Sequence, residues 1–197
     1  MKKIKSSLFN MVAVLTIIAG FSAILVSFAY IKTENIIIAN EQKMEMSAIE
    51  EIFGSDFDNN PIEEGTIIND KRHNKNIEIY PLRYGNSIYA LAIKSYTKKG
   101  YGGNIDLMVG FYLDNTMAGY RILNHKETPG LGSKIMEESF MKQFRGLILS
   151  DKALNLRSVG GEIDGITSAT ISSKALLDGV KRAKSAYDKF TLGERNE

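Results

Sequence analysis

Residues 87–123 read SIYALAIKSYTKKGYGGNIDLMVGFYLDNTMAGYRIL, and this stretch decides the fold. Three runs within it are rich in β-branched, aromatic and other apolar residues that alternate with polar ones, a pattern typical of half-buried strands. The dipeptide Asp114-Asn115 separates the last two runs, as expected at the turn of a hairpin. The predicted strands are Ser87–Tyr96, Asp106–Leu113 and Met117–Leu123.

A fourth run extends this pattern toward the N-terminus. Ile77–Leu82 alternates in the same way and is joined to Ser87 by the turn-forming residues 83–86. The glycine-rich segment Lys99–Gly103 links the two hairpins. It is either a flexible turn or a loop whose glycines let the backbone approach a ligand. The middle of the chain is therefore predicted to be an antiparallel sheet.

Helical periodicity flanks the predicted sheet on both sides. We expect helices over residues 34–53, 134–144 and 172–190, with a polar break at 54–65. The last helix carries an apolar stripe that favours core packing over a partner surface. The residues of this stripe are Leu176, Val180, Ala183, Tyr187 and Phe190.

The N-terminal segment is long and apolar enough to span a membrane. No charged residue occurs from Leu8 to Ile31, and a helix of this length extends about 36 Å, more than the roughly 30 Å of a hydrocarbon core. A cleaved signal peptide is the alternative, but its apolar region is usually shorter. Lysines concentrate before the span, so the positive-inside rule places the N-terminus in the cytoplasm and the remainder outside.

Composition excludes several classes of protein. The chain has no Cys and two His among 197 residues, which excludes a disulfide framework, a thiolate zinc site and a cysteine-held iron–sulfur cluster. We predict no metal site and no catalytic residue. A formal net charge of +2 gives no reason to expect binding to nucleic acid.

The first segment that could carry chemistry is residues 125–134, HKETPGLGSK. It follows a predicted strand and precedes a predicted helix. Pro129 restricts the backbone, while Gly130 and Gly132 permit close approach. Free N–H groups at a helix start suit an anionic or flat polar ligand. A tight strand-to-helix connection explains the pattern equally well.

The second such segment is residues 164–173, DGITSATISS, which opens the last predicted helix. Ser172 or Thr170 could simply cap that helix. A cap needs one hydroxyl, however, and this segment supplies five. A phosphate placed here would meet the positive end of the helix dipole and unpaired amides. The residues therefore support a phosphate-bearing group at this position without identifying it.

Together the two segments resemble the FMN-binding domain shared by the G subunit of the Rnf electron-transport complex and the C subunit of the sodium-translocating NADH:quinone reductase. In that family a [Ser/Thr]-Gly-Ala-Thr-x-[Ser/Thr] motif carries FMN through a phosphoester to its threonine. Here the motif reads TSATIS at residues 167–172, so the resemblance implies attachment to Thr170. Ser168 replaces the usual glycine, and it is strained by about 1–2 kcal/mol if that position requires a positive φ.

The resemblance also implies a set of roles and partners. FMN is attached by a separate magnesium-dependent flavin transferase that uses FAD, and the chain relays electrons among other membrane subunits of a ferredoxin:NAD+ oxidoreductase that translocates ions. Asp164 assists this transfer, caps the loop or is a surface turn acid, and Lys134 neutralises phosphate or is merely solvated. His125 is a structural hydrogen-bonder or takes a direct role in the site. The implied cofactor-binding residues are Thr170, Thr167, Ser168, Ala169, Ile171, Ser172, Asp164, Glu127, Thr128, Gly130, Leu131, Gly132 and Lys134.

The fold class expected is α+β: a single transmembrane helix followed by one extracytoplasmic FMN-binding domain of antiparallel strands and flanking helices, in a bacterial cytoplasmic membrane. The expected segments are a cytoplasmic N-terminus at 1–7, the membrane helix at 8–31, a connector helix and linker at 32–65, and the FMN-binding domain at 66–197. Three alternatives remain: a quinone-reductase C-type subunit, a flavin-free membrane-anchored binding or assembly protein, and a secreted hydrolase. The hydrolase lacks a Gly-x-Ser-x-Gly elbow.

Overall fold

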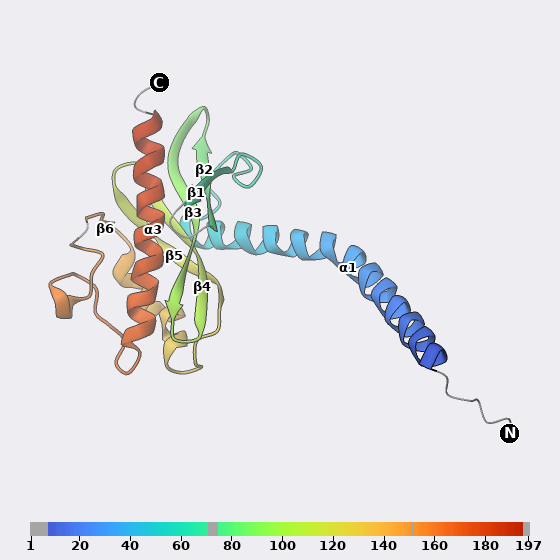
Figure 1. Cartoon of the computed structure of the whole chain (residues 1–197). Coiled ribbons are helices and arrows are strands. Elements are labelled where there is room, and N and C mark those ends of the chain that lie inside the picture. Colours follow the sequence, from blue (N-terminus) through green and yellow to red (C-terminus); the bar gives the residue numbers. More distant parts are fainter. Residues whose placement is uncertain (1–7, 71–74, 151, 195–197) are drawn as a thin grey trace. The chain divides into compact units, whose positions relative to one another are not determined.

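The computed structural model describes residues 8–70, 75–150 and 152–194 (Figure 1). The predicted cytoplasmic segment 1–7 lies outside the described residues. The chain forms two compact units, Met1–Lys43 and Met44–Glu197. The first helix, α1 (Leu8–Phe53), is 46 residues long and begins in the first unit. It contains both the predicted membrane helix and the predicted helix over 34–53.

The first part of α1 has the character of a membrane anchor. The large apolar side chains from Leu8 to Ile31 are exposed, which is unfavourable in water and favourable in a lipid bilayer. Within the part of the chain that the structure describes, α1 is the one helix long and apolar enough to cross a membrane.

The second unit is built on one antiparallel sheet whose strand order repeats the order of the chain. The two predicted hairpins are confirmed as β2–β3 and β4–β5, and each strand is longer than predicted. The two edge strands were not predicted. The strands are β1 (Thr66–Asp70), β2 (Lys75–Tyr84), β3 (Ser87–Gly100), β4 (Gly103–Tyr112), β5 (Thr116–His125) and β6 (Leu147–Ile148).

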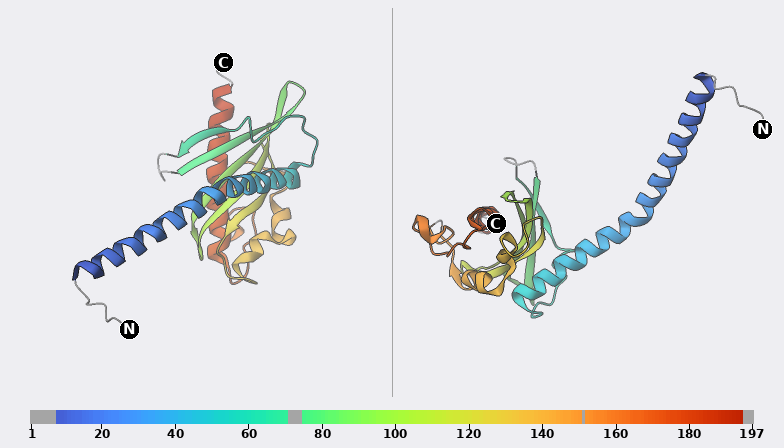
Figure 2. Two further views of the ribbon diagram at one scale, coloured as in Figure 1. Left: turned by 90° about the vertical axis from the view of Figure 1, so that its right-hand side faces the viewer. Right: turned by 90° about the horizontal axis from the view of Figure 1, so that it is seen from below.

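Alternating side chains send the two faces of the sheet into two separate cores. One face packs against α3 (Thr170–Glu194), the last helix, and the other packs against the final turns of α1 (Figure 2). On β3, for example, Leu91 and Ile93 enter the α3 core, while Ala90 and Ala92 enter the α1 core. This alternation is the period-2 pattern read from the sequence.

The final helix is confirmed, and it begins two residues before the predicted start. Its apolar stripe lies in the core as expected, with Phe190 half-buried at the edge. A Cβ at Gly179 would approach Leu107 Cδ2 to 2.7 Å, so this glycine permits close packing of α3 on β4. The Ser95 hydroxyl donates to the Gly179 carbonyl at 2.8 Å and fixes the helix against β3.

The prediction of one helix over 134–144 was wrong. The segment consists of three short pieces, η1 (Gly132–Met136), α2 (Glu138–Met141) and η2 (Lys142–Phe144). Glu137 is extended, with φ −72° and ψ 138°, and interrupts the helix. The buried Tyr120 hydroxyl donates to the Ile135 carbonyl, and the Tyr120 ring packs edge-on against Phe144. Contacts with Tyr120 of β5 therefore hold the segment on both sides of the interruption.

A polar cluster joins the end of α1 to the sheet within the second unit. The buried Glu45 carboxylate accepts from the Tyr80 hydroxyl and from the Lys94 ammonium, each at 2.7 Å. Glu78 contacts the same hydroxyl at 2.7 Å. Burial raises the pKa of Tyr80, and the hydrogen bonds with Glu78 and Glu45 raise it further. The cluster satisfies a carboxylate that would otherwise be buried without a partner.

Candidate functional site

A left-handed turn at Ser168 leads the chain into α3. Ser168 has φ 64°, and Asn115 is the other non-glycine residue with a positive φ in the described chain. The turn is closed by the Ala169 N–H, which donates to the Ile166 carbonyl at 3.0 Å. The position that normally holds glycine in the motif therefore does require a positive φ. The expected strain of about 1–2 kcal/mol applies to Ser168.

The serines of the first turn of α3 are buried and engaged. Ser173 Oγ accepts from the Ile166 N–H and donates to the Ala169 carbonyl, both at 3.0 Å. Ser172 Oγ donates to the Glu127 carboxylate. The position before the helix is Ala169, which has no side-chain oxygen. Neither Thr170 nor Ser172 caps the helix, and the two serines instead anchor its first turn.

The opposite side of this turn is exposed and has unsatisfied polar groups. Thr170 and Ile171 are exposed. Among the described residues, the Thr170 hydroxyl has no hydrogen-bond partner, and the N–H groups of Thr170, Ile171 and Ser172 have no acceptor. The first N–H groups of any helix lack helical partners. A free hydroxyl among three free amides at the start of a 25-residue helix fits a phosphate ester.

Glu127 connects this turn to the rest of the site. It is 5% exposed, and its Oε1 accepts from the Gly102 N–H at 2.8 Å while its Oε2 accepts from Ser172 Oγ. A Cβ at Gly132 would lie 2.5 Å from Glu127 Oε2 and 2.7 Å from Ser172 Oγ. The carboxylate thus brings together the β3–β4 turn, the 125–134 segment and α3. It supports the site from beneath.

The glycines of the β3–β4 turn are explained by this packing. Gly100 pairs with Gly103 across the turn. A Cβ at Gly102 would overlap the backbone of Lys126, and one at Gly100 would meet Glu127 Oε1 at 2.7 Å. These glycines let the turn close on the 125–134 segment, a reason that neither sequence interpretation of Lys99–Gly103 had proposed.

The 125–134 segment is a compact connection between β5 and η1. The Thr128 carbonyl accepts from the N–H groups of Leu131 and Ser133, both at 3.2 Å. Gly130 has φ 73°, and its N–H donates to Ser133 Oγ at 2.9 Å. Leu131 is 45% exposed and presents an apolar surface to solvent. Internal hydrogen bonds therefore hold an exposed apolar side chain in place.

The charged and imidazole side chains of the predicted site have separate roles. His125 Nδ1 accepts from the Glu127 N–H at 3.0 Å, as a structural hydrogen-bonder does. Asp164 is exposed and pairs with Arg157 at 3.1 Å. Lys134 is half-buried, and its N–H donates to the Leu131 carbonyl at 3.2 Å. Each assignment of these residues to flavin binding stays a prediction.

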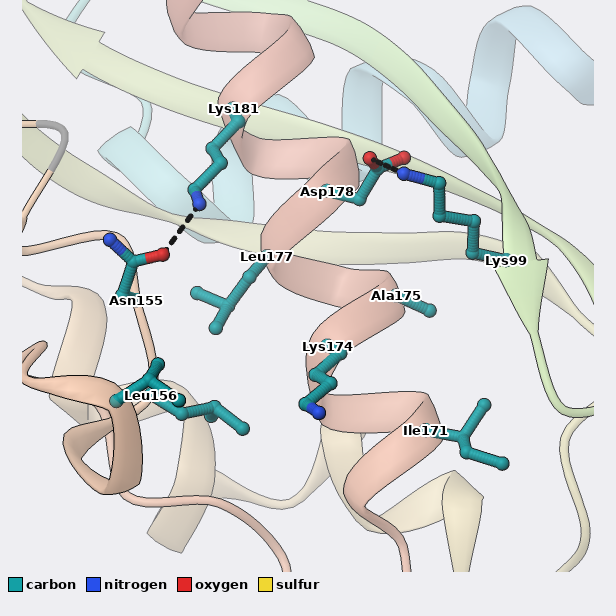
Figure 3. Close-up of a pocket in the computed structure, with 10 residues that line it drawn as sticks. Lys99, Asn155, Leu156, Ile171, Lys174, Ala175, Leu177, Asp178 and Lys181 are labelled. Atoms are coloured by element: carbon teal, nitrogen blue, oxygen red, sulfur yellow. Dashed lines mark hydrogen bonds and ion pairs between the residues drawn. The ribbon is translucent and has the colours of Figure 1, made fainter.

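A cavity of about 480 Å³ lies beside α3 and was missed by the sequence reasoning (Figure 3). Its walls combine apolar side chains with three lysines. The sequence carried a signal for one wall only, because Ile171, Lys174, Asp178 and Lys181 recur at spacings of three and four residues along one helix face. The lining residues are Lys99, Asn155, Leu156, Val159, Ile171, Lys174, Ala175, Leu177, Asp178 and Lys181.

The one carboxylate in the cavity wall, that of Asp178, already accepts three hydrogen bonds. Asp178 accepts from Thr97 at 2.9 Å, Lys99 at 2.6 Å and Arg182 at 3.0 Å. Burial opposes ionisation of Asp178, but the hydrogen bonds from Lys99, Thr97 and Arg182 outweigh it and hold its pKa below the ordinary value. The carboxylate therefore serves to hold α3 against β3.

Comparison with known proteins identifies the family. A model of the FMN-binding domain matches residues 100–185. The G subunit of the ion-translocating oxidoreductase complex from Vibrio cholerae serotype O1 (strain M66-2) is 32% identical over 178 residues, which cover 86% of this chain and 85% of that protein. The chain belongs to this family of G subunits. The protein of the same name from Stutzerimonas stutzeri is 33% identical over 146 residues, 72% of this chain and 63% of that protein.

Among solved structures, the C subunit of the Na+-translocating NADH-quinone reductase from Parabacteroides distasonis is similar at 22% identity and a TM-score of 0.48. The similarity covers 58% of this chain and 62% of that chain. The family resemblance read from residues 125–134 and 164–173 is confirmed by the G-subunit relatives and by the matched domain. The matched FMN-binding domain contains Glu127 and the whole first turn of α3.

Proposed function

We propose that this chain carries FMN as a phosphoester on Thr170 and relays electrons as the G subunit of an ion-translocating, Rnf-type oxidoreductase complex. The observation that carries the proposal is the exposed Thr170 hydroxyl, which has no partner in the described chain and lies among three unpaired N–H groups. Membership of the G-subunit family and the match to the FMN-binding domain support FMN as the cofactor and electron transfer as the role.

The residues present fit this group. The free amides of the first turn suit phosphate oxygens, and the exposed side chains of Ile171 and Leu131 offer apolar contacts to an aromatic ring. Bound FMN supplies one- and two-electron redox chemistry. Glu127 and Ser172 hold the turn in place, and the Ser168 turn presents Thr170 to solvent. Lining of the flavin by Thr128, Gly130 and Gly132 belongs to the same proposal.

Attachment of FMN is a phosphoryl transfer from FAD performed by a separate flavin transferase. A bond forms between Thr170 Oγ and the phosphorus of the FMN half, and the diphosphate bond of FAD breaks. The hydroxyl proton is lost and AMP leaves. No electrons are exchanged in this step. The amides of the α3 first turn are placed to stabilise negative charge on the phosphoryl oxygens.

The membrane arrangement completes the proposal. The chain is a single-pass membrane protein anchored by α1, and the lysines before the span place its N-terminus in the cytoplasm. The domain that follows is extracytoplasmic, where it contacts other membrane subunits of the complex. The basis for the orientation is the charge bias flanking the span.

The intact mass of the full chain purified from its own membrane tests the proposal. We expect a gain equal to FMN less one water, and peptide mapping should locate it at Thr170. Thr170→Ala should abolish the gain. Thr191→Val is the matched control, because Thr191 lies near the far end of the same helix and bonds only within it. An unmodified wild-type mass from cells with an active transferase would refute the proposal and favour a flavin-free binding protein.

A further inference from the structure

Three lysines line the cavity beside α3, and two of them are already engaged. Lys99 pairs with Asp178 at 2.6 Å, and Lys181 donates to Asn155 Oδ1 at 2.7 Å. Among the described residues, the Lys174 ammonium has neither an ion-pair nor a hydrogen-bond partner. Its side chain is exposed at the cavity wall (Figure 3). Lys174 is therefore the cavity lysine whose charge is available to a ligand.

Helix geometry directs this charge toward Thr170. Lys174 follows Thr170 by four residues, so both lie on one face of α3, about 6 Å apart along the axis. Side chains on a helix lean toward its N-terminus, and in Figure 3 Lys174 extends toward the end of α3 where Ile171 lies. An extended lysine reaches about one helical turn, so its ammonium can reach a group attached to Thr170.

The first turn of α3 offers amides to an anion but no other charge. In the described chain, Ser172 and Ser173 are engaged beneath it, and the exposed Asp164 pairs with Arg157. A phosphodiester carries one negative charge, and hydrogen bonds from an ammonium to such an anion are roughly twice as strong as those from neutral donors. Lys174 supplies that ammonium from the same helix.

We propose that Lys174 pairs with the phosphate on Thr170, and so both favours flavin attachment and fixes the attached phosphodiester at the mouth of the cavity. This inference rests on the proposed function. It assigns to Lys174 the role of phosphate neutralisation that the sequence had suggested for Lys134. Lys174 acts as a positioning and charge-neutralising residue and takes no part in the redox chemistry.

The test measures FMN incorporation into the full-length apo chain by the transferase with FAD, followed by intact mass. We expect Lys174→Gln to lower the initial rate about tenfold and Lys174→Arg to restore most of it. Lys189→Gln is the matched control, because Lys189 is exposed on α3 about 28 Å from Thr170. Its rate should equal that of the wild type.

A second readout separates pairing from a structural effect. In the loaded full chain, the phosphorus-31 resonance of the phosphodiester should shift in Lys174→Gln and stay unchanged in Lys189→Gln. A loaded wild type with the same rate and the same resonance as Lys174→Gln would refute the role of Lys174 alone. A wild-type chain that takes up no FMN would refute the proposed function and this inference with it.

Discussion

The first and third turns of α3 use polar residues in opposite ways. In the third turn, Asp178 accepts three hydrogen bonds and Gly179 accepts one from Ser95. In the first turn, the inner face is engaged through Ser172 and Ser173, whereas the outer face leaves one hydroxyl and three amides without partners in the described chain. Polar groups whose hydrogen bonds are all made hold a helix in place. Exposed polar groups without hydrogen-bond partners remain available to bind a ligand or to react.

Removing the support beneath the first turn should have the largest effect on stability. Glu127→Ala leaves the buried Ser172 hydroxyl and the Gly102 N–H without their acceptor. We expect the free energy of unfolding to fall by about 2–3 kcal/mol. Urea unfolding of the detergent-solubilised full chain, followed by circular dichroism, measures it. Glu127→Gln should lose less, and a loss below about 0.5 kcal/mol for the alanine variant would contradict the supporting role.

Removing the carboxylate from the third turn should lower the free energy of unfolding by a smaller amount, and this loss should depend on pH. Because the folded pKa of Asp178 is depressed, its contribution is complete above the unfolded pKa of about 4 and is lost as the pH falls through the folded value. We expect Asp178→Asn to lower the free energy of unfolding by about 1–2 kcal/mol at pH 7. The difference from the wild type should shrink below pH 4, and a difference independent of pH would contradict this assignment.

Relaxing the turn before α3 should stabilise the chain modestly. Ser168→Gly removes the strain of a positive φ but adds backbone entropy to the unfolded state, so we expect a net gain of about 0.5–1 kcal/mol. Asn115→Gly is the contrasting variant at the other positive-φ residue and should gain less, because it also removes the hydrogen bond from the Asn115 amide to the Leu149 carbonyl at 3.2 Å. Thermal unfolding of both variants in detergent measures the gain. A Ser168→Gly variant less stable than the wild type would show that serine makes a compensating contact.

Altering the outer face of the first turn should have the smallest effect on stability. Thr170→Val keeps the shape of the side chain and removes a hydroxyl that has no partner in the described chain. We expect a change within about 0.5 kcal/mol in the unflavinylated protein, measured by the same urea titration. A larger loss would mean that the hydroxyl has a structural partner, and the contrast between the two turns would fail.

The two hairpins and the last helix were predicted correctly, because short-range sequence patterns determine them. The β2–β3 and β4–β5 hairpins followed from alternation and from turn residues such as Asp114 and Asn115, and α3 followed from its apolar stripe. The break at Glu137 could not be predicted, because it depends on Tyr120 reaching the Ile135 carbonyl. Strand β6 has two residues, too few for any periodic signal.

The candidate site also has parts that the sequence predicted and parts that it did not. The segments 125–134 and 164–173 were singled out because their small residues and glycines lie close together in sequence, whereas the assignment to Thr170 came from the family resemblance. The support that Glu127 gives to Ser172 was missed, because 45 residues separate the two. The lysine-lined cavity was missed for the same reason, since Lys99 and Asn155 reach it from other elements. Contacts between distant segments leave little trace in a single sequence.

The order of the strands has a consequence for how the domain folds. Because each strand pairs with the next along the chain, the sheet is built from pairings between neighbouring segments, and β2–β3, β3–β4 and β4–β5 are joined by short turns. Helix α3 closes much longer loops, since Thr97 and Asp178 are 81 residues apart. In the first turn, Ser172 reaches Glu127 only once α3 has docked, because 45 residues separate the two. A modified Thr170 would then mark a domain that has finished folding.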